Sequence, residues 1–591
     1  MTPDSAVSSS ATAAAQGPRG TIPRRGPRSP RSLLASPGVM AEGSRCLNVN
    51  VGVLGHVDSG KTSLVASLSS ILSTAALDKN PQSQARGITL DLGFSAFKVP
   101  LPQHVSHLPF DNLQFTLVDC PGHASLIRTI IGGANIMDIM ILVVDITKGI
   151  QVQTAECLVI GEVTAQQMLV VLNKIDLLPA ETRDRAINKL KKRLAKTLKL
   201  TKFWDCKMIP VAAKPGGNNP AVGVEELASE LTAMVQGPPV RRSGPFLFAI
   251  DHCFPIKGHG TILTGTVLQG ELSVNNVLEI PHLKEKRKVK SMQMFKQNAL
   301  KIQGGDRAGV CVTNLDPAKI ERGLAAAPGT VPTFQGAIAW VDKIRFYSGS
   351  VKSKSKFHVT VGHSTVMATV RFFSTVAGAM GSEEEAVNAL LQRLSHLSLK
   401  KPSDKFCFEN EYLHEEVLHG PCEEAASSSG QPKYFGQQWA LLQFDVPLTA
   451  PKDAVLIGAR LDTDVQCASC RLAFYGQLVA PIDLSNPDEA AKLKVFKWKE
   501  KTGVIDRVQP DGKTAICRNL LKKGTDLRAF MGLKVVAGNG SPGVLESTFG
   551  TTGKVKVFFQ AGLGRNWQED KTVKLVFKRF QFGADKKRIV Q

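Results

Sequence analysis

No apolar run in this chain of 591 residues approaches the roughly 20 residues needed to cross a bilayer, so the sequence predicts no transmembrane helix. Its eleven cysteines form no regular framework. Cys467 and Cys470 make a C-x-x-C pair with no second pair nearby, so we interpret it as structural, with zinc as the less favoured alternative. Reduced thiols fit a cytosolic protein. We therefore expect a cytoplasmic location and leave the nucleus open.

Residues 1–39 lack lysine and contain a single acidic residue, Asp4. They are rich in alanine, serine, proline, glycine and arginine and cannot build a core, which predicts a disordered N-terminal extension. The same composition resembles a mitochondrial transit peptide, but prolines interrupt any amphipathic helix. A start codon upstream of Met40, or a mispredicted first exon, explains the extension equally well.

The net charge of +22 is unevenly placed. Residues 491–591 carry 22 lysines and arginines against 8 acidic residues, whereas the middle of the chain is close to neutral. This distribution predicts that the C-terminal part meets a polyanion, most simply RNA. A chain of this length also exceeds one hydrophobic core, so several domains are expected.

A phosphate-binding loop is the most specific local signal. An apolar run, Val49–Leu54, leads into a G-x-x-x-x-G-K-T motif, and a helical segment follows from Ser63. Glycines allow backbone N–H groups to face phosphate oxygens, Lys61 can reach the β- and γ-phosphates, and the Thr62 hydroxyl can bind Mg²⁺. The predicted phosphate-binding residues are Gly55, His56, Val57, Asp58, Ser59, Gly60, Lys61 and Thr62.

The sequence Asn173-Lys174-Ile175-Asp176 follows a buried strand candidate and predicts guanine recognition. The Asp176 carboxylate can accept hydrogen bonds from N1–H and the 2-amino group of guanine, whereas adenine would leave it unpaired. Asn173 is expected to orient the loop, and the Lys174 stem to cover the base. Ala212, Ala213 and Lys214 follow the next strand candidate, where a backbone N–H can face the guanine oxygen.

A third motif, Asp119-Cys120-Pro121-Gly122-His123, lies between these two. Asp119 matches the acidic residue that holds Mg²⁺ in P-loop hydrolases, and the Gly122 N–H can face a γ-phosphate. His123 is the candidate that positions the attacking water. Residues 86–91, which include Thr89, lie where GTPases place the loop that closes over the γ-phosphate and Mg²⁺.

The pattern along the chain predicts an α/β P-loop GTPase domain with a doubly wound, mostly parallel sheet, then two β-barrels and a C-terminal β-rich domain. A surface helix is predicted at 183–198 from the spacing of Ile187, Leu190, Leu194 and Leu198. The predicted strands of the first domain are Val49–Leu54, Phe115–Asp119, Met140–Asp145, Met168–Leu172 and Met208–Val211. The predicted domains are 40–236 for GTP binding, 244–331 and 332–482 for the barrels, and 483–591 for the basic C-terminal domain.

Two features of the later domains qualify this division. The second barrel is interrupted near 378–433 by an acidic stretch, interpreted as a flexible insertion with a short helix at 382–399, and residues 483–491 are interpreted as a linker. Predicted strands at 493–498 and 573–580 alternate basic and apolar residues. Their lysines either face solvent or contact RNA, and the basic charge with interleaved aromatic residues favours RNA.

These motifs together resemble those of the translational GTPases related to elongation factor Tu, and residues 257–265 resemble the second-domain signature of that group. Longer strings at 85–97, 116–138, 171–179, 288–295 and 470–477 closely resemble the eukaryotic selenocysteine-specific elongation factors. The resemblance covers about 47–591. Ala212 departs from it, because Tu-like factors usually have serine there.

The resemblance implies a GTPase that binds GTP or GDP with Mg²⁺ and carries selenocysteyl-tRNA to ribosomes paused at a recoded UGA. It implies Mg²⁺ ligation by Thr62 and Thr89 and a catalytic His123 that acts when the ribosome positions it. The C-terminal domain is expected to meet the selenocysteine insertion element of the mRNA and its binding protein.

The resemblance also places Asp251, His252 and Arg307 at a selenocysteine pocket. A selenol is an anion at neutral pH, so Arg307 and His252 can supply charge and donors, and we expect Asp251 to fix and charge His252. A salt-bridged barrel surface is the alternative reading of these three residues. The alternatives for the whole chain are a general or initiator aminoacyl-tRNA carrier and a GTP-dependent RNA-binding scaffold without delivery.

Overall fold

The structure is a computed structural model. The residues it describes are 45–72, 92–122, 127–134, 136–199, 201–216, 219–238, 243–256, 258, 260–375, 405–420, 437–462, 470–522, 527–549, 553–582 and 589–591. The extension at 1–39, the helix predicted at 382–399, and Thr89, His123 and Cys467 therefore lie outside the described residues.

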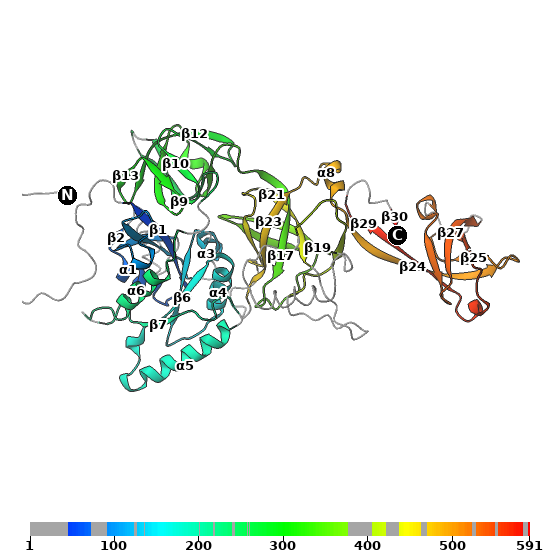
Figure 1. Ribbon diagram of the computed structural model, residues 1–591, viewed down its shortest axis with the longest axis horizontal. Coiled ribbons are helices and arrows are strands. Elements are labelled where there is room, and N and C mark those ends of the chain that lie inside the picture. Colours follow the sequence, from blue (N-terminus) through cyan, green and yellow to red (C-terminus); the bar gives the residue numbers. More distant parts are fainter. Residues whose placement is uncertain are drawn as a thin grey trace, which may run out of the picture. The chain divides into compact units, whose positions relative to one another are not determined.

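The N-terminal domain is built on a sheet with strand order β2-β3-β4-β1-β5-β6-β7 (Figure 1). Strands β4, β1, β5, β6 and β7 run parallel, and β3 and β2 add antiparallel pairings at one edge. The strands are β1 Cys46–Gly55, β2 Ile71–Leu72, β3 Gly93–Pro100, β4 Asn112–Asp119, β5 Ile139–Asp145, β6 Gln167–Asn173 and β7 Met208–Val211. The predicted mostly parallel sheet is confirmed, and β3 is a strand that the sequence reading missed.

Helices cover both faces of this sheet, as a doubly wound fold requires. One apolar cluster packs α3, α4 and α5 against the sheet, and another packs α1 and α6 against it. The predicted surface helix is confirmed, because α5 buries Ile187, Leu190, Leu194 and Leu198 and exposes the basic residues between them. The helices are α1 Lys61–Leu68, α3 Ile127–Ala134, α4 Val152–Thr164, α5 Ala180–Leu198 and α6 Val224–Met234, with short 3-10 helices at Gln103–Val105 and Ile175–Leu177.

The first barrel follows the N-terminal domain. Six of its strands pair in the order β11-β16-β8-β9-β15-β12, and β11 pairs with β12 to close the ring. Its strands are β8 Leu247–Ile256, β9 Gly260–Gln269, β10 Glu271–Ser273, β11 Val277–Ile280, β12 Glu285–Met294, β13 Gln297–Ala299, β14 Lys301–Gln303, β15 Arg307–Val312 and β16 Gly323–Ala326, with a 3-10 helix at Pro317–Lys319.

The second barrel closes in the same way, with the order β18-β22-β23-β17-β21-β19 and a pairing of β18 with β19. Side chains fill the interior of a closed ring, and large ones such as Phe357, Phe372 and Phe474 are fully buried in its apolar cluster. Its strands are β17 Thr333–Lys343, β18 Lys356–Val361, β19 Ser364–Thr375, β20 Tyr412–Glu415, β21 Gln438–Thr449, β22 Val455–Ala459 and β23 Leu472–Pro481.

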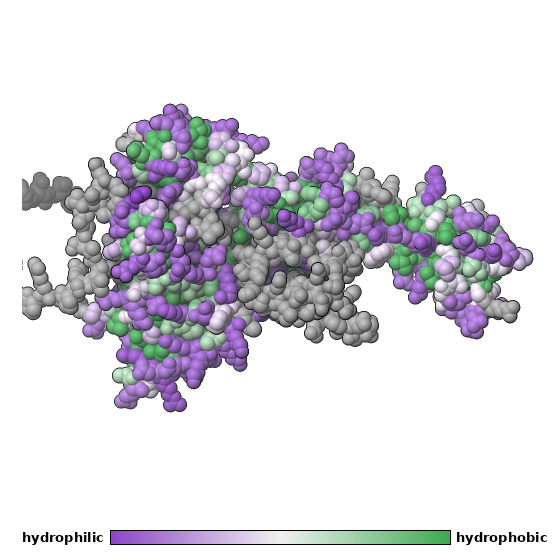
Figure 2. Space-filling view, viewed as in Figure 1, coloured by the Kyte–Doolittle hydropathy of each residue, from purple (hydrophilic) through white to green (hydrophobic). Residues whose placement is uncertain are grey.

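The C-terminal β-rich domain is itself a closed ring, in the order β24-β25-β28-β27-β26-β29 with β24 paired to β29. The alternation predicted at 573–580 is confirmed, because Val573, Leu575 and Phe577 are buried and Lys574 is exposed. Figure 2 shows hydrophilic residues interspersed with hydrophobic ones over this barrel. Its strands are β24 Val495–Val508, β25 Thr514–Arg518, β26 Lys534–Ala537, β27 Pro542–Phe549, β28 Lys554–Phe558, β29 Thr572–Phe580 and β30 Ile589–Val590, with 3-10 helices at Leu527–Phe530 and Arg565–Gln568.

Two predictions about connecting segments are corrected. Within the stretch interpreted as a flexible insertion, residues 405–420 are packed, and β20 pairs with β19 and with β24. Tyr412 of β20 is 1% exposed, and it anchors a cluster of aromatic rings with Phe373 and Phe406. The segment interpreted as a linker contains helix α8, Pro487–Lys492, which begins after the Asn486 cap. Strand β20 is stabilised by its pairing with β24 of the C-terminal domain, a contact between domains that a local pattern does not show.

Among the described residues, no helix is long and apolar enough to cross a membrane.

Candidate functional site

The loop between β1 and α1 has the backbone conformation that a phosphate cradle needs. Asp58 and Gly60 both have left-handed φ angles, 59° and 86°. A side chain on Gly60 would be strained by this angle, and its Cβ would also lie 2.2 Å from Nδ2 of Asn173. Gly60 is therefore required both for the turn and for the close approach of the guanine loop.

Lys61 is held under this loop at 6% exposure. Its Nζ donates a hydrogen bond to the backbone oxygen of His56 at 2.8 Å, and a Cβ on Gly122 would lie 2.3 Å from it. Burial lowers the pKa of Lys61, and the Asp119 carboxylate opposes that shift. The ammonium thus lies between the phosphate loop and Gly122, where it can contact phosphate oxygens.

Thr62 and Asp119, the two described candidates for Mg²⁺, lie together. The Thr62 hydroxyl donates to Oδ2 of Asp119 at 2.7 Å. A carboxylate and a hydroxyl are oxygen ligands of the kind that Mg²⁺ prefers, so this pair fits the ion.

Asn173 connects the phosphate loop to the loop after β7. Its Nδ2 donates to the backbone oxygen of Ser59 at 2.9 Å, and its Oδ1 accepts from the backbone N–H of Ala213 at 3.1 Å. Because both ends of the amide are used, Asn173 holds three segments that are distant in sequence at one edge of the sheet. The structure thus brings the predicted phosphate and guanine residues together.

Lys174 adopts a left-handed conformation, φ 68°, and its Nζ lies 2.8 Å from Oδ2 of Asp145. Burial would raise the pKa of Asp145, but hydrogen bonds from Lys174 and Thr147 outweigh it and lower the pKa. Asp176 follows on the 3-10 helix Ile175–Leu177 and is half-buried. The sequence reading missed Asp145, although its place at the carboxyl end of a predicted strand was a signal.

A second cluster surrounds Arg307 on β15. Its guanidinium donates to Oδ2 of Asp251 at 2.5 Å and to Thr266 at 3.3 Å, and it stacks on the ring of Phe94 from β3. Asp251 and Arg307 are both buried. Arg307 is opposite Thr266 and His252 is opposite Thr264 in the pairings with β9, so the three predicted pocket residues lie on β8 and β15, the two strands that flank β9.

The expected role of Asp251 is corrected by this arrangement. Among the described residues its carboxylate contacts Arg307 and His363, whose Nε2 is 3.6 Å from Oδ1, and not His252. Asp251 and His252 are consecutive residues of β8, and successive side chains of a strand point to opposite faces, so contact of Asp251 with other residues is expected. Phe94 and His363 come from the first domain and the second barrel, so no local sequence signal could have identified them.

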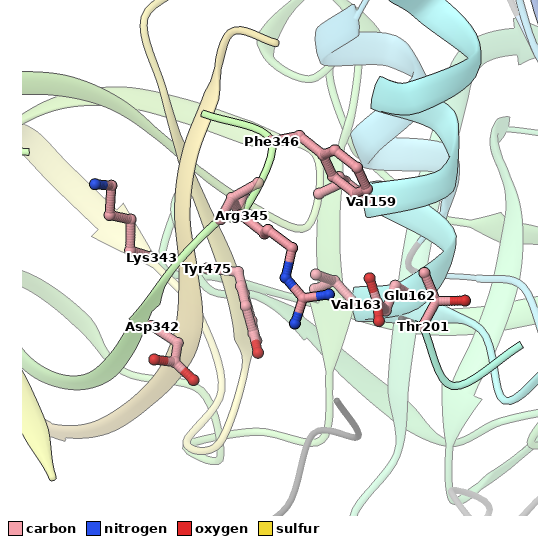
Figure 3. Close-up of a pocket in the computed structure, with 10 residues that line it drawn as sticks. Val159, Glu162, Val163, Thr201, Asp342, Lys343, Arg345, Phe346 and Tyr475 are labelled. Carbon is pink, nitrogen blue, oxygen red and sulfur yellow. The ribbon is translucent and has the colours of Figure 1, made fainter. Parts of the chain in front are cut away.

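A small cavity of about 30 Å³ lies between helix α4 and the two strands β17 and β23, and it has room for one or two waters (Figure 3). Glu162 of α4 and Arg345 extend their charged ends toward each other in this view. Burial raises the pKa of Glu162 to about 7, against the opposing effect of Lys202 and Arg345. Its Oε1 has no hydrogen-bond partner among the described residues. This is a buried carboxyl at an internal interface, away from the phosphate loop.

The elongation factor Tu GTP-binding domain matches residues 47–240, the third domain of eukaryotic selenocysteine-specific elongation factors matches 338–476, and the C-terminal RIFT domain of that group matches 491–587. The mouse selenocysteine-specific elongation factor is 46% identical over 535 residues, which cover 88% of this chain and 89% of the mouse protein. The chain belongs to the selenocysteine-specific elongation factors.

Another selenocysteine-specific elongation factor, from Methanocaldococcus jannaschii, is 38% identical over 55% of this chain and 66% of its own length. Among solved structures, translation elongation factor SelB from Methanococcus maripaludis, in complex with the GTP analogue GppNHp, matches with a TM-score of 0.64 and 23% identity. That match covers 91% of this chain and 99% of the SelB chain, and it shows the shared fold. This member of the selenocysteine-specific elongation factors is accordingly a translational GTPase with a guanine-nucleotide site.

Proposed function

We propose that this factor binds selenocysteyl-tRNA in its GTP-bound state, delivers it to the ribosome at recoded UGA codons, and hydrolyses GTP on delivery. The observation that carries the proposal is the likeness to the mouse factor along 88% of the chain, together with a guanine loop and phosphate loop joined through Asn173. The selenocysteine insertion element and its binding protein are the proposed partners of the C-terminal domain. A cytoplasmic location fits this role, and the nucleus is proposed only as an additional location.

The proposed division of labour keeps the predicted domains, 40–236, 244–331, 332–482 and 483–591. In the first, backbone N–H groups of the phosphate loop and Lys61 bind phosphates, while Asp176 selects guanine. Mg²⁺, held by Thr62, Asp119 and Thr89, would neutralise phosphate charge. His123 positions the water that attacks the γ-phosphate once the ribosome is bound.

The selenocysteyl group is proposed to lie at His252 and Arg307. Arg307 is a permanent cation with a rigid donor fork, and the buried carboxylate of Asp251 holds that fork in one orientation. His252 supplies a further donor on β8, which lies on the other side of β9 from Arg307. A selenolate gains charge-assisted hydrogen bonds from both groups, whereas the neutral hydroxyl of serine carries no charge and gains less.

The C-terminal barrel is proposed to bind RNA mainly through phosphates. Its support is the excess of 14 positive charges over residues 491–591 and the exposed Trp498, whose ring has the Lys578 ammonium 5.7 Å from its centroid. Such binding should weaken linearly in log K against log salt concentration.

The test of delivery specificity is the ratio of affinities for selenocysteyl-tRNA and seryl-tRNA on the same tRNA body. We expect His252→Ala and Arg307→Ala to reduce that ratio while GTP binding is kept. Because Arg307→Ala leaves Asp251 buried without its partner, the double variant Asp251→Asn/Arg307→Gln removes both charges and serves as the folded comparison. Lys301→Ala removes an exposed cation from the same barrel and is the control. A wild-type ratio in all three pocket variants would place selenocysteine recognition elsewhere.

A further inference from the structure

A cavity of about 340 Å³ lies where the second barrel meets the C-terminal domain, a size suited to a small ligand group. Its wall from the second barrel carries Lys354, Arg371, His414 and Gln443, on or beside β19, β20 and β21. Gln581 and Phe582, which follow β29, form the opposite side. This cavity is separate from the nucleotide loop and from the cluster at Arg307.

Two cations, Lys354 and Arg371, face this cavity, and Lys354 is near enough to the Glu416 carboxylate to help lower its pKa. Arg371 is half-buried and Lys354 is exposed, and neither forms an ion pair with any carboxylate that the structure describes. Arg371 makes a long contact of 3.4 Å to Oε1 of Gln443, and its guanidinium lies 5.7 Å from the centre of the Phe582 ring. Burial alone accounts for the lowered pKa of Arg371. Partial burial of a cation is costly unless an anion compensates it.

His414 adds a buried donor to the same wall. Its side chain is 3% exposed, and Nε2 has no hydrogen-bond partner in the described part of the chain, the Glu416 carboxylate being 3.6 Å away. Burial lowers the pKa of His414 to about 4, and the nearby Lys497 adds to this effect. The imidazole is therefore neutral at physiological pH, and a neutral imidazole offers one N–H and one acceptor nitrogen.

The carboxylates near this wall are already engaged by other lysines. Glu416 pairs with Lys497, and Glu411 pairs with Lys578 at 2.6 Å. Neither carboxylate is a lining residue of the cavity. The charge that the cavity presents is consequently positive.

We propose that this junction cavity is a binding site for a phosphate group, held by Lys354 and Arg371 as cations and by His414 and Gln443 as hydrogen-bond partners. A phosphate offers several acceptor oxygens and negative charge, which matches two cations and an unused imidazole. The phosphate can belong to an RNA backbone or to a small phosphorylated molecule. Because residues of both domains line the site, its occupation would stabilise their junction.

The test uses the full chain with GDP and Mg²⁺ bound, so that the phosphate loop is filled. The variant Lys354→Gln/Arg371→Gln removes both cations, and Lys356→Gln/Lys452→Gln removes two exposed cations from the same barrel as the matched control. Pyrophosphate is titrated by calorimetry, and a short labelled single-stranded RNA is titrated by fluorescence anisotropy. We expect the cavity variant to lose about tenfold or more in affinity and the control to change less than about twofold.

Loss of affinity for both probes supports the site and assigns it to RNA backbone phosphate. Loss for pyrophosphate alone supports the site and assigns it to a small phosphorylated ligand. A second variant, Gln443→Glu, places a carboxylate at an exposed strand position on the cavity wall and should weaken binding by a similar factor without loss of folding. The proposal is overturned if Lys354→Gln/Arg371→Gln and Gln443→Glu bind both probes as tightly as the control does. That outcome would leave the proposed tRNA delivery untouched, since its measurement uses different residues.

Discussion

Glu156 and Arg471 form a buried ion pair across 315 positions of sequence. Oε1 of Glu156 accepts hydrogen bonds from the backbone N–H and from Nε of Arg471, and Oε2 accepts from Nη2 at 2.9 Å. Glu156 lies on α4 of the GTP-binding domain, and Arg471 directly precedes β23 of the second barrel. Both side chains are shielded from water, so this pair fixes the two domains to each other through charge and geometry.

Breaking this pair should destabilise the factor strongly. Glu156→Ala leaves a buried guanidinium without its partner, which costs roughly 3–5 kcal/mol. The double replacement Glu156→Leu/Arg471→Met should recover much of that loss, because apolar pairs of similar volume often replace buried ions without cost. Thermal unfolding followed by calorimetry measures both changes.

The exposed pair Lys207–Glu230 provides the control for this experiment. Lys207→Ala should cost no more than about 1 kcal/mol, since water already solvates both groups. Equal losses from Glu156→Ala and Lys207→Ala would show that the buried pair contributes nothing beyond an ordinary surface contact.

Asp176→Asn should change the preferred base. The substitution turns one acceptor into a donor, so the variant should bind GTP weakly and gain affinity for xanthosine triphosphate, which carries an oxygen where guanine has its amino group. Competition binding with the two nucleotides gives the ratio. Asp184→Asn on α5 is a matched exposed control in the same domain. A variant that still prefers GTP would refute the assigned role of Asp176.

His123→Ala should separate nucleotide binding from hydrolysis. GTP affinity should match that of the wild type, whereas ribosome-stimulated turnover should fall by about 10²–10⁴, the range expected of a catalytic proton-transfer group. His107→Ala, at an exposed position of the same domain, is the control. A fall of tenfold or less in single-turnover hydrolysis would argue against a catalytic role.

Glu162 should make stability depend on pH. Its pKa is about 7 in the folded protein against an ordinary value of 4.5, so the folded state holds a proton that the unfolded state releases. The contribution to stability is therefore full below pH 4.5 and is lost as the pH rises through 7. Glu162→Gln cannot ionise. At pH 8 its free energy of unfolding should exceed that of the wild type by up to roughly 3 kcal/mol, and its melting temperature should be higher.

The difference between Glu162→Gln and the wild type should vanish toward pH 4.5. Glu230→Gln on α6 is the exposed comparison and should show no such trend. Parallel melting curves for wild type and Glu162→Gln from pH 5 to 8 would mean that Glu162 stays ionised in its cavity.

The sequence predicted those elements whose buried residues recur with the period of a single helix or strand. The spacing of Ile187, Leu190, Leu194 and Leu198 placed α5, and each apolar run of the parallel sheet became a strand. Strand β3 was not predicted, and the structure shows that its first five residues are all buried. The closed ring of the C-terminal domain also could not be predicted, because closure depends on pairing between strands far apart in sequence.

The site residues also fall into those that the sequence predicted and those that it did not. Motifs identified the phosphate loop and the guanine loop because their chemistry lies in contiguous residues. Arg307 was identified with Asp251, but His363, which contacts Asp251, and Phe94, which stacks on Arg307, could not be, since they come from other parts of the chain. The buried strand β20 was read as a flexible stretch because its stabilising partners, β19 and β24, lie outside it.

The closure of the C-terminal ring has a consequence for incomplete chains. Strand β24 opens that ring and β29 seals it through pairings from Phe496↔Phe580 to Val504↔Thr572, while β29 also covers the edge of β26. A nonsense or frameshift change before Thr572 would expose two unpaired strand edges at once. Such edges recruit other chains, so truncated copies should aggregate and be degraded even though the phosphate and guanine loops are encoded intact.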